Sequence, residues 1–269
     1  MKAYLDPKIQ AFIRYFDFPG SEPVVVYLAG LGGASTAAYP RIVIESGLSD
    51  RRSILVDWFG HGYSDKPDHF GYSLEEHASV ISRLLDHIGS KQYVLVGHSM
   101  GGAVAIELAS RRSEIIVQLV LAEANLEAGG GIMSSSIANM KESNFIASGY
   151  QEMINDRRSA VLAGDSTASI ALGIWQVASP LAFHRSAVSL VKGTQPIMWD
   201  QLIKLPIPRT FIFGSRSLEE YEEDKELYKR LESHGIQVAI VPDAGHGMMA
   251  ENPVGVARVI SESLARSSL

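Results

Sequence analysis

Residues Gly97 to Gly101 read Gly-His-Ser-Met-Gly, and this stretch carries the strongest chemical signal in the chain. A serine between two glycines fits a nucleophile elbow, in which a strand stops, a helix starts and the residue at the bend has a strained backbone. The apolar run before Gly97 and the helix-compatible run from Ala103 fit this arrangement. The bend would lift the Ser99 hydroxyl clear of the sheet and aim the Met100 backbone N–H at an attacked carbonyl oxygen. We therefore expect nucleophilic catalysis by Ser99.

A serine hydroxyl is a weak nucleophile at neutral pH, so the chemistry also needs a general base. His246 is the candidate, because it follows a strand-like run and a glycine in a loop expected at the same sheet edge as Ser99. No other histidine has such a position, and we expect His98, within the elbow, to pack beside it. Serine and histidine together indicate acyl transfer, most simply ester hydrolysis through an acyl-enzyme.

The elements that must position these residues can be read from the hydrophobic pattern. Strand-like runs alternate with amphipathic segments, which predicts an α/β fold with a doubly wound, mostly parallel sheet covered on both faces. Ser73 and Glu76 form a capping box that predicts a helix through about His87. Residues 126–205 show helical periodicities and no strand-like run. The expected strands are 12–18, 23–28, 53–56, 93–97, 118–122, 209–213 and 238–241, and a closing helix is expected over 253–265.

Further motifs accompany the elbow along the chain. A glycine-rich stretch, Ala29 to Gly33, follows a strand-like run, and residues 57–67 fit the pattern D-x-x-G-x-G-x-S-x-x-P. Near the C-terminus Gly245 precedes His246. In this order the motifs resemble the α/β-hydrolase family over the whole core. The resemblance implies a hydrolase core of residues 1–125 and 206–269. It also implies a helical cap, residues 126–205, inserted after the family's sixth strand (residues 118–122 here) and placed over the nucleophile.

The resemblance also implies an oxyanion hole made by the backbone N–H groups of Leu31 and Met100. Family members often have His-Gly before the first donor, whereas this chain has Ala29-Gly30. Because the donors are backbone groups, the difference removes only a supporting side chain. A haloalkane dehalogenase would need aspartate in place of Ser99 and usually tryptophan in place of Met100, so that chemistry is not expected.

The acid of the expected triad departs from the common family pattern. The family usually has an aspartate after the seventh strand, but Ser217 stands there. Haloalkane dehalogenases and coelenterazine luciferases of this fold include members with the acid after the sixth strand, where this chain has Glu123. We predict Glu123 as the acid, with Glu219 or Glu220 as the alternative. The order Ser217 to Glu220 otherwise predicts a capping box with Ser217 as the N-cap.

The predicted cap combines soft apolar side chains with a balanced charge. Its six acidic and six basic residues cancel, so no charged funnel toward the active site is expected. Methionine fills irregular apolar space, which would suit either helix packing or a substrate pocket. The pocket candidates are Trp175, Met133, Met140, Met153 and Met248.

Composition limits the partners of the protein. Its 269 residues, 46% hydrophobic, suit one α/β domain with an insertion. A net charge of −6 without a basic stripe argues against nucleic acid or an anionic membrane surface. The absence of cysteine, of metal-ligand spacing and of a signal-peptide segment predicts no metal, no cofactor and a cytoplasmic location. The expected partner is a small, neutral or apolar substrate, and the sequence does not indicate an oligomeric state.

Several alternatives stay open at this point. The same triad could cleave an amide, lactone, thioester or carbon–carbon bond. A small-molecule receptor of this fold could also keep the triad without turnover. A dinucleotide-binding fold is suggested by Gly30-x-Gly32-Gly33 with Asp57, but it lacks the third glycine and leaves the elbow unexplained. Turnover of a simple chromogenic ester separates an esterase from a receptor.

Overall fold

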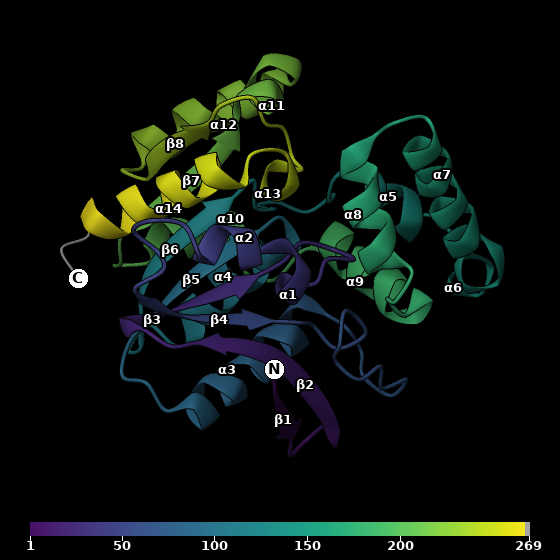
Figure 1. Cartoon of the computed structure of the whole chain (residues 1–269), viewed down its shortest axis with the longest axis horizontal. Helices are drawn as coiled ribbons and strands as arrows, with labels where there is room; N and C mark the ends of the chain where they lie inside the picture. The colour runs from purple at the N-terminus through teal and green to yellow at the C-terminus, as the bar shows by residue number, and fades with distance from the viewer. Residues whose placement is uncertain (267–269) are drawn as a thin grey trace.

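The computed structural model describes residues 1–266 and contains one eight-stranded sheet with the order β1-β2-β4-β3-β5-β6-β7-β8 (Figure 1). β2 is antiparallel to its neighbours β1 and β4, and every other neighbouring pair is parallel. The predicted α/β class with a mostly parallel sheet is confirmed, and β1 is an edge strand that the sequence patterns did not predict. The strands are β1 Lys2–Asp6, β2 Ala11–Phe18, β3 Ser21–Leu28, β4 Arg51–Val56, β5 Tyr93–His98, β6 Ile116–Ala122, β7 Arg209–Gly214 and β8 Gln237–Val241.

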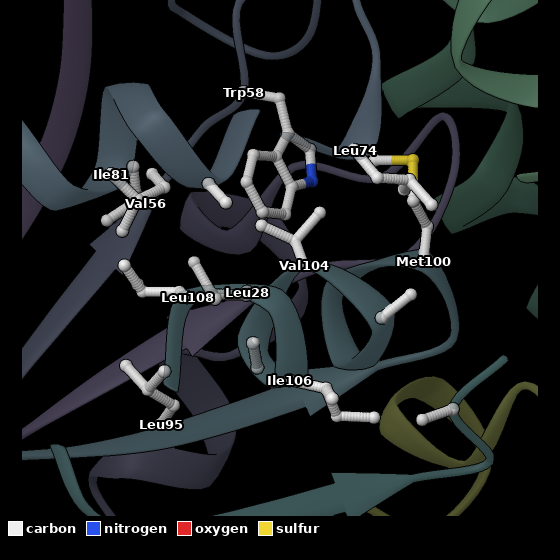
Figure 2. Packing of buried hydrophobic residues seen from close by; sticks show 14 of the residues in the cluster. Leu28, Val56, Trp58, Leu74, Ile81, Leu95, Met100, Val104, Ile106 and Leu108 are labelled. Carbon is white, nitrogen blue, oxygen red and sulfur yellow. The ribbon is translucent and has the colours of Figure 1, made fainter. Parts of the chain in front are cut away.

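Helices cover both faces of the sheet. Successive strand residues point to opposite sides, and apolar side chains on both sides are buried beneath these helices. In β5, Leu95 joins a hydrophobic cluster with α3 (Leu74–Ile88) and α4 (Met100–Arg111), while Val96 joins a second cluster with α2 (Pro40–Val43) and α14 (Pro253–Arg266). Figure 2 shows the first cluster, where Trp58 and Val104 pack together. The helices are α1 Ser35–Ala38, α2 Pro40–Val43, α3 Leu74–Ile88, α4 Met100–Arg111, α5 Ile132–Ala138, α6 Glu142–Asn144, the π-helix Phe145–Gly149, α7 Tyr150–Leu162, α8 Ser166–Trp175, α9 Pro180–Lys192, α10 Met198–Lys204, α11 Ser215–Glu220, α12 Glu222–Ser233, α13 Met248–Glu251 and α14 Pro253–Arg266.

Of the two capping boxes predicted from sequence, one is confirmed and the other is wrong. Ser73 caps α3: its hydroxyl accepts from Glu76 N–H at 3.2 Å, and the Glu76 carboxylate accepts from Ser73 N–H at 3.0 Å. Ser217 is not an N-cap, because α11 begins at Ser215 with Gly214 as its N-cap. Ser217 is instead buried inside the helix. β7 passes directly into α11, so the local Ser-x-x-Glu pattern falls one turn too late to start it.

Within residues 1–266, the segment between β6 and β7 is helical and contains no strand. Helices α5 to α9 form a group at one side of the sheet in Figure 1, and we call them the α5–α9 group. Hydrogen bonds tie this group to the core, among them Ser179 N–H to Gly60 O at 2.7 Å and Leu74 N–H to Ser189 Oγ at 3.0 Å. α10 lies elsewhere, packed against α4, where Gln201 Nε2 donates to a Glu107 carboxylate oxygen at 2.8 Å. None of the described helices is both long and apolar enough to cross a membrane.

Candidate active site

Ser99 forms the turn between β5 and α4. Its backbone has φ 51° and ψ −120°, a strained conformation for a residue with a Cβ. Close packing explains the two glycines around it. A Cβ on Gly97 would lie 2.6 Å from the Gly101 oxygen, and one on Gly101 would lie 2.2 Å from the Leu28 oxygen. Strand, turn and helix can therefore meet this closely only with glycine at both positions.

His246 and Glu123 meet beside this turn. His246 Nδ1 lies 2.7 Å from Glu123 Oε2, within the distance expected for a base and its orienting acid. Glu123 directly follows β6, and His246 lies in the loop after β8. The Glu123 side chain is 9% exposed and that of His246 is 60% exposed, so the acid is shielded while the imidazole is accessible. Because an ionised carboxylate only accepts hydrogen bonds, Nδ1 carries the proton and Nε2 is free to accept one.

Hydrogen bonds keep the Glu123 carboxyl ionised. Burial by itself raises its pKa, but the hydrogen bond from His246 and that from Gly214 N–H, at 2.8 Å, outweigh burial and lower the pKa below its ordinary value. The Ser217 side chain lies close enough to this carboxylate to lower its pKa further. Ser217 stands where the resemblance led us to expect an aspartate, so the ends of the sixth and seventh strands supply side chains to one place. The alternative acids Glu219 and Glu220 are exposed, and neither has a side-chain hydrogen bond or ion pair with another described residue.

The Ser99 hydroxyl has a partner that sequence reasoning missed. It donates to Oδ1 of Asn125 at 3.4 Å, a long hydrogen bond. No hydrogen bond links Ser99 Oγ with His246 among residues 1–266. Asn125 lies two positions beyond Glu123, so one strand end brings both an acid and an amide to the site. That position beyond the carboxyl end of a parallel strand is the signal that could have identified it.

His98 links the elbow to the loop that carries His246. Its Nε2 lies 2.9 Å from the His246 carbonyl oxygen, and the two imidazole rings are 4.7 Å apart. Since a carbonyl only accepts, His98 donates from Nε2. Burial, followed by the adjacent His246, lowers the pKa of His98 to about 3, so its ring is neutral at physiological pH. The sequence led us to expect simple packing here, and the structure adds a hydrogen bond that holds the His246 backbone.

Leu31 and Met100, the two expected oxyanion donors, are both buried near the elbow. Met100 is the first residue of α4, so its N–H is one of the donors that a helix leaves unsatisfied. Leu31 follows Gly30, and a Cβ on Gly30 would lie 3.2 Å from the Cβ of Ser99. Trp58 Nε1 donates to Ala29 O at 3.0 Å and supports this loop. The loop therefore has a buried support although it lacks the histidine that family members often carry there.

A cavity of about 230 Å³ lies within the α5–α9 group. Trp175 connects it to the loop that contains Leu31 and Gly32, because a Cβ on Gly32 would lie 2.8 Å from Trp175 Nε1. The cavity is lined by Met133, Met153, Asp156, Arg157, Ala160 and Trp175.

The five pocket candidates lie in different places. Three of them, Trp175, Met133 and Met153, line this cavity. The side chain of Met140 packs on Gly149 instead. Met248 is fully buried in the hydrophobic cluster that packs against α14. Neither Met140 nor Met248 contributes to the cavity lining.

Two further buried histidines lie under α9. His77 Nε2 lies 3.4 Å from Ser186 Oγ of α9, and the His61 ring is 6.0 Å from the Phe183 ring. Burial lowers the pKa of His77 to about 3 and that of His61 to about 4. Across residues 1–266, no group of three His, Cys, Asp or Glu side chains is placed to hold a metal ion.

Comparison with known proteins identifies the family. The family model described as alpha/beta hydrolase fold matches residues 23–171, which is more than half of the chain. The chain belongs to the alpha/beta hydrolase fold family. It is a hydrolase, as the elbow and the loop motifs predicted.

Similar proteins in this family span nearly the whole chain. A candidate 2-succinyl-6-hydroxy-2,4-cyclohexadiene-1-carboxylate synthase of Bacillus subtilis (strain 168) is 26% identical over 266 residues, covering 91% of this chain and 92% of its own. The enol-lactonase of Burkholderia xenovorans LB400 superposes with a TM-score of 0.80 at 15% identity, covering 98% of this chain and 100% of its own. A thermophilic esterase of Thermogutta terrifontis has a TM-score of 0.78 at 22% identity, covering 96% of this chain and 94% of its own. At these identities the solved structures establish a shared fold.

Proposed function

We propose that this hydrolase cleaves a small carboxylic ester with an apolar acyl chain through an acyl-enzyme. Ser99 is the nucleophile, His246 the general base and Glu123 the acid that orients it. The proposal rests chiefly on the 2.7 Å contact between His246 Nδ1 and Glu123 Oε2 beside the strained Ser99 turn. A buried carboxylate that fixes the tautomer of an accessible imidazole is what a serine nucleophile requires.

The reaction follows from these positions. Ser99 Oγ turns from Asn125 toward His246 Nε2, which takes its proton as Oγ bonds to the ester carbonyl carbon. The carbonyl oxygen becomes negative, and the N–H groups of Leu31 and Met100 stabilise it. His246 returns the proton to the leaving alcohol as the carbon–oxygen bond breaks, which leaves an acyl group on Ser99. Water then attacks this acyl group as His246 takes its proton, and His246 returns that proton to Ser99 Oγ as the carbon–Oγ bond breaks and the carboxylic acid leaves.

The α5–α9 group would serve as the cap of this site. Its cavity of about 230 Å³ is smaller than the roughly 300–1,000 Å³ of typical drug-sized sites, which favours a short acyl chain. Met133 and Met153 offer apolar surface for that chain. The same residues could open a lactone, amide or thioester by the same steps, and a lactonase is among the proteins that share the fold.

Turnover of p-nitrophenyl esters from acetate to octanoate tests the proposal. The wild-type protein should turn over repeatedly and prefer short chains, and Ser99→Ala should lose on the order of 10⁶ in rate, as comparable triads do. Ser113→Ala, at an exposed serine, is the matched control and should keep wild-type activity. A single slow turnover would indicate a receptor, and undiminished activity of Ser99→Ala would reject the assigned nucleophile.

A further inference from the structure

We infer that the preferred substrate is a half-ester of a short dicarboxylic acid, whose free carboxylate binds Arg157. The inference rests on the proposed function and names its substrate class. It departs from the expectation of a neutral acyl group, which rests on the charge count of residues 126–205, by adding a charged end to an otherwise apolar acyl chain. The acidic and basic residues of this segment are equal in number, but only their geometry decides which cation lacks an ion-pair partner.

Arg157 is a half-buried cation that has no protein acceptor in the part of the chain that the structure describes. Its guanidinium stacks over the Trp175 ring, 4.8 Å from the ring centroid. Among residues 1–266 its side chain has no ion pair and no hydrogen bond. The charge of Arg157 contributes to lowering the pKa of Asp165, but the two side chains form no ion pair. Oδ1 of Asp165 instead accepts hydrogen bonds from the N–H groups of Thr167, at 2.9 Å, and Ala168, at 3.1 Å. The guanidinium donors are therefore held in place by an aromatic ring and remain available to a ligand.

Trp175 links this cation to the loop that carries the proposed oxyanion donor Leu31. Arg157 and Trp175 line the same cavity, and the Trp175 indole packs on Gly32, next to the oxyanion donor Leu31. The Tyr150 hydroxyl lies within hydrogen-bonding distance of Trp175 O and, at 2.9 Å, of Ala178 O, and its single proton can serve either carbonyl at the end of α8. One anchored aromatic ring thus separates the guanidinium from the oxyanion loop. A short chain with its ester carbonyl at that loop can extend past Trp175 to the cation.

The chemistry of the lining favours a carboxylate at the far end of the chain. The planar guanidinium matches a carboxylate with two parallel hydrogen bonds, and a half-buried site strengthens them. Met133 and Met153 would contact the methylene groups between the two carboxyls. Asp156 lines the same cavity, and its negative charge opposes an anionic ligand. Removing that charge should therefore strengthen selection for the half-ester.

Monoethyl glutarate and ethyl pentanoate test the inference, because they have equal acyl length and differ in the terminal carboxylate. Acid release in a pH-stat gives kcat/KM for both. Arg157→Gln should lower kcat/KM for monoethyl glutarate about 10- to 100-fold, the usual effect of losing a hydrogen bond to a charged group, and leave ethyl pentanoate nearly unchanged. Arg158→Gln, at the exposed neighbouring residue, is the matched control and should change neither. Asp156→Asn should raise kcat/KM for monoethyl glutarate alone.

The outcomes separate this inference from the proposed function. If ethyl pentanoate is hydrolysed through Ser99 but Arg157→Gln affects both esters equally, the inference is overturned and the hydrolase assignment stands. The same conclusion follows if the wild-type protein prefers ethyl pentanoate. If neither ester is hydrolysed and a fluorophosphonate fails to label Ser99, the proposed function is rejected together with the inference.

Discussion

The carboxylate of Glu123 serves two donors, and its amide replacement can serve only one of them. Oε2 accepts from His246 Nδ1 at 2.7 Å, and Oε1 accepts from Gly214 N–H at 2.8 Å. In Glu123→Gln, an amide oxygen that keeps the Gly214 hydrogen bond turns the NH₂ group toward Nδ1. The imidazole then carries its proton on Nε2, where it can no longer accept the proton of Ser99.

The size of the effect follows from this change of tautomer. The equivalent change in a serine protease triad costs about 10⁴ in kcat, so we expect Glu123→Gln to lose about 10³ to 10⁴, or roughly 4 to 5.5 kcal/mol of transition-state stabilisation. KM should stay nearly constant, because Glu123 makes no contact with substrate in the proposed mechanism. Losing one hydrogen bond to a charged group costs about 1.5–3 kcal/mol, which a domain of ordinary stability survives.

Steady-state kinetics on p-nitrophenyl butyrate, with circular dichroism to check folding, measures both effects. Glu219→Gln and Glu220→Gln are the matched controls, since both side chains are exposed, and each should change stability by no more than about 0.5 kcal/mol and leave activity intact. Adding Ser217→Asp to Glu123→Gln should restore part of the rate, because the Ser217 side chain already reaches the Glu123 carboxylate. A greater loss in either control than in Glu123→Gln would return the acid to the helix after β7.

Two further predictions concern His98 and His77. His98→Phe keeps an aromatic ring but removes the donor to the His246 carbonyl, so kcat should fall about 2- to 10-fold at constant KM. His98→Gln should recover part of this loss. Equal rates for the two variants would mean that His98 acts through packing and not through its hydrogen bond. His77 has a folded pKa of about 3, below its unfolded value of 6.5, so its contribution to stability is present above 6.5 and is lost as pH falls toward 3. Urea melts should show that the free energy of unfolding falls less steeply between pH 7 and pH 4 in His77→Phe than in the wild-type protein, by up to about 1.4 kcal/mol per pH unit. Identical pH dependence in the two proteins would mean that His77 is protonated in the folded protein.

The parts of the site that the sequence predicts are those with a strict backbone requirement. Gly97 and Gly101 are needed because any Cβ there would overlap main-chain atoms, so the elbow leaves a readable pattern around Ser99. The strand ends that carry Glu123 and His246 also follow from hydrophobic runs, because a parallel sheet gathers its carboxyl ends at one edge.

The parts that sequence reasoning missed depend on how loops and side chains meet in space. Asn125 contacts Ser99 Oγ, and His98 contacts the His246 carbonyl oxygen. Both contacts join residues that are far apart in the sequence, so no local periodicity predicts them. Ser217 misled the capping prediction, because a local Ser-x-x-Glu pattern cannot show that the preceding strand runs straight into the helix. A balanced charge count could not single out Arg157, whose guanidinium stacks on Trp175 and has no ion pair among the described residues.

Covalent labelling tests the central claim most directly. A fluorophosphonate reacts only with a serine whose hydroxyl is activated by a base and whose adduct is stabilised by an oxyanion hole. Intact-mass and peptide mass spectrometry should find one adduct per chain, on the peptide that contains Ser99, and none in Ser99→Ala. Labelling of Glu123→Gln should be slower by the same factor as its turnover. An adduct on another serine, or an unlabelled wild-type protein with its fold intact, would contradict the assignment of Ser99, His246 and Glu123 as one catalytic unit.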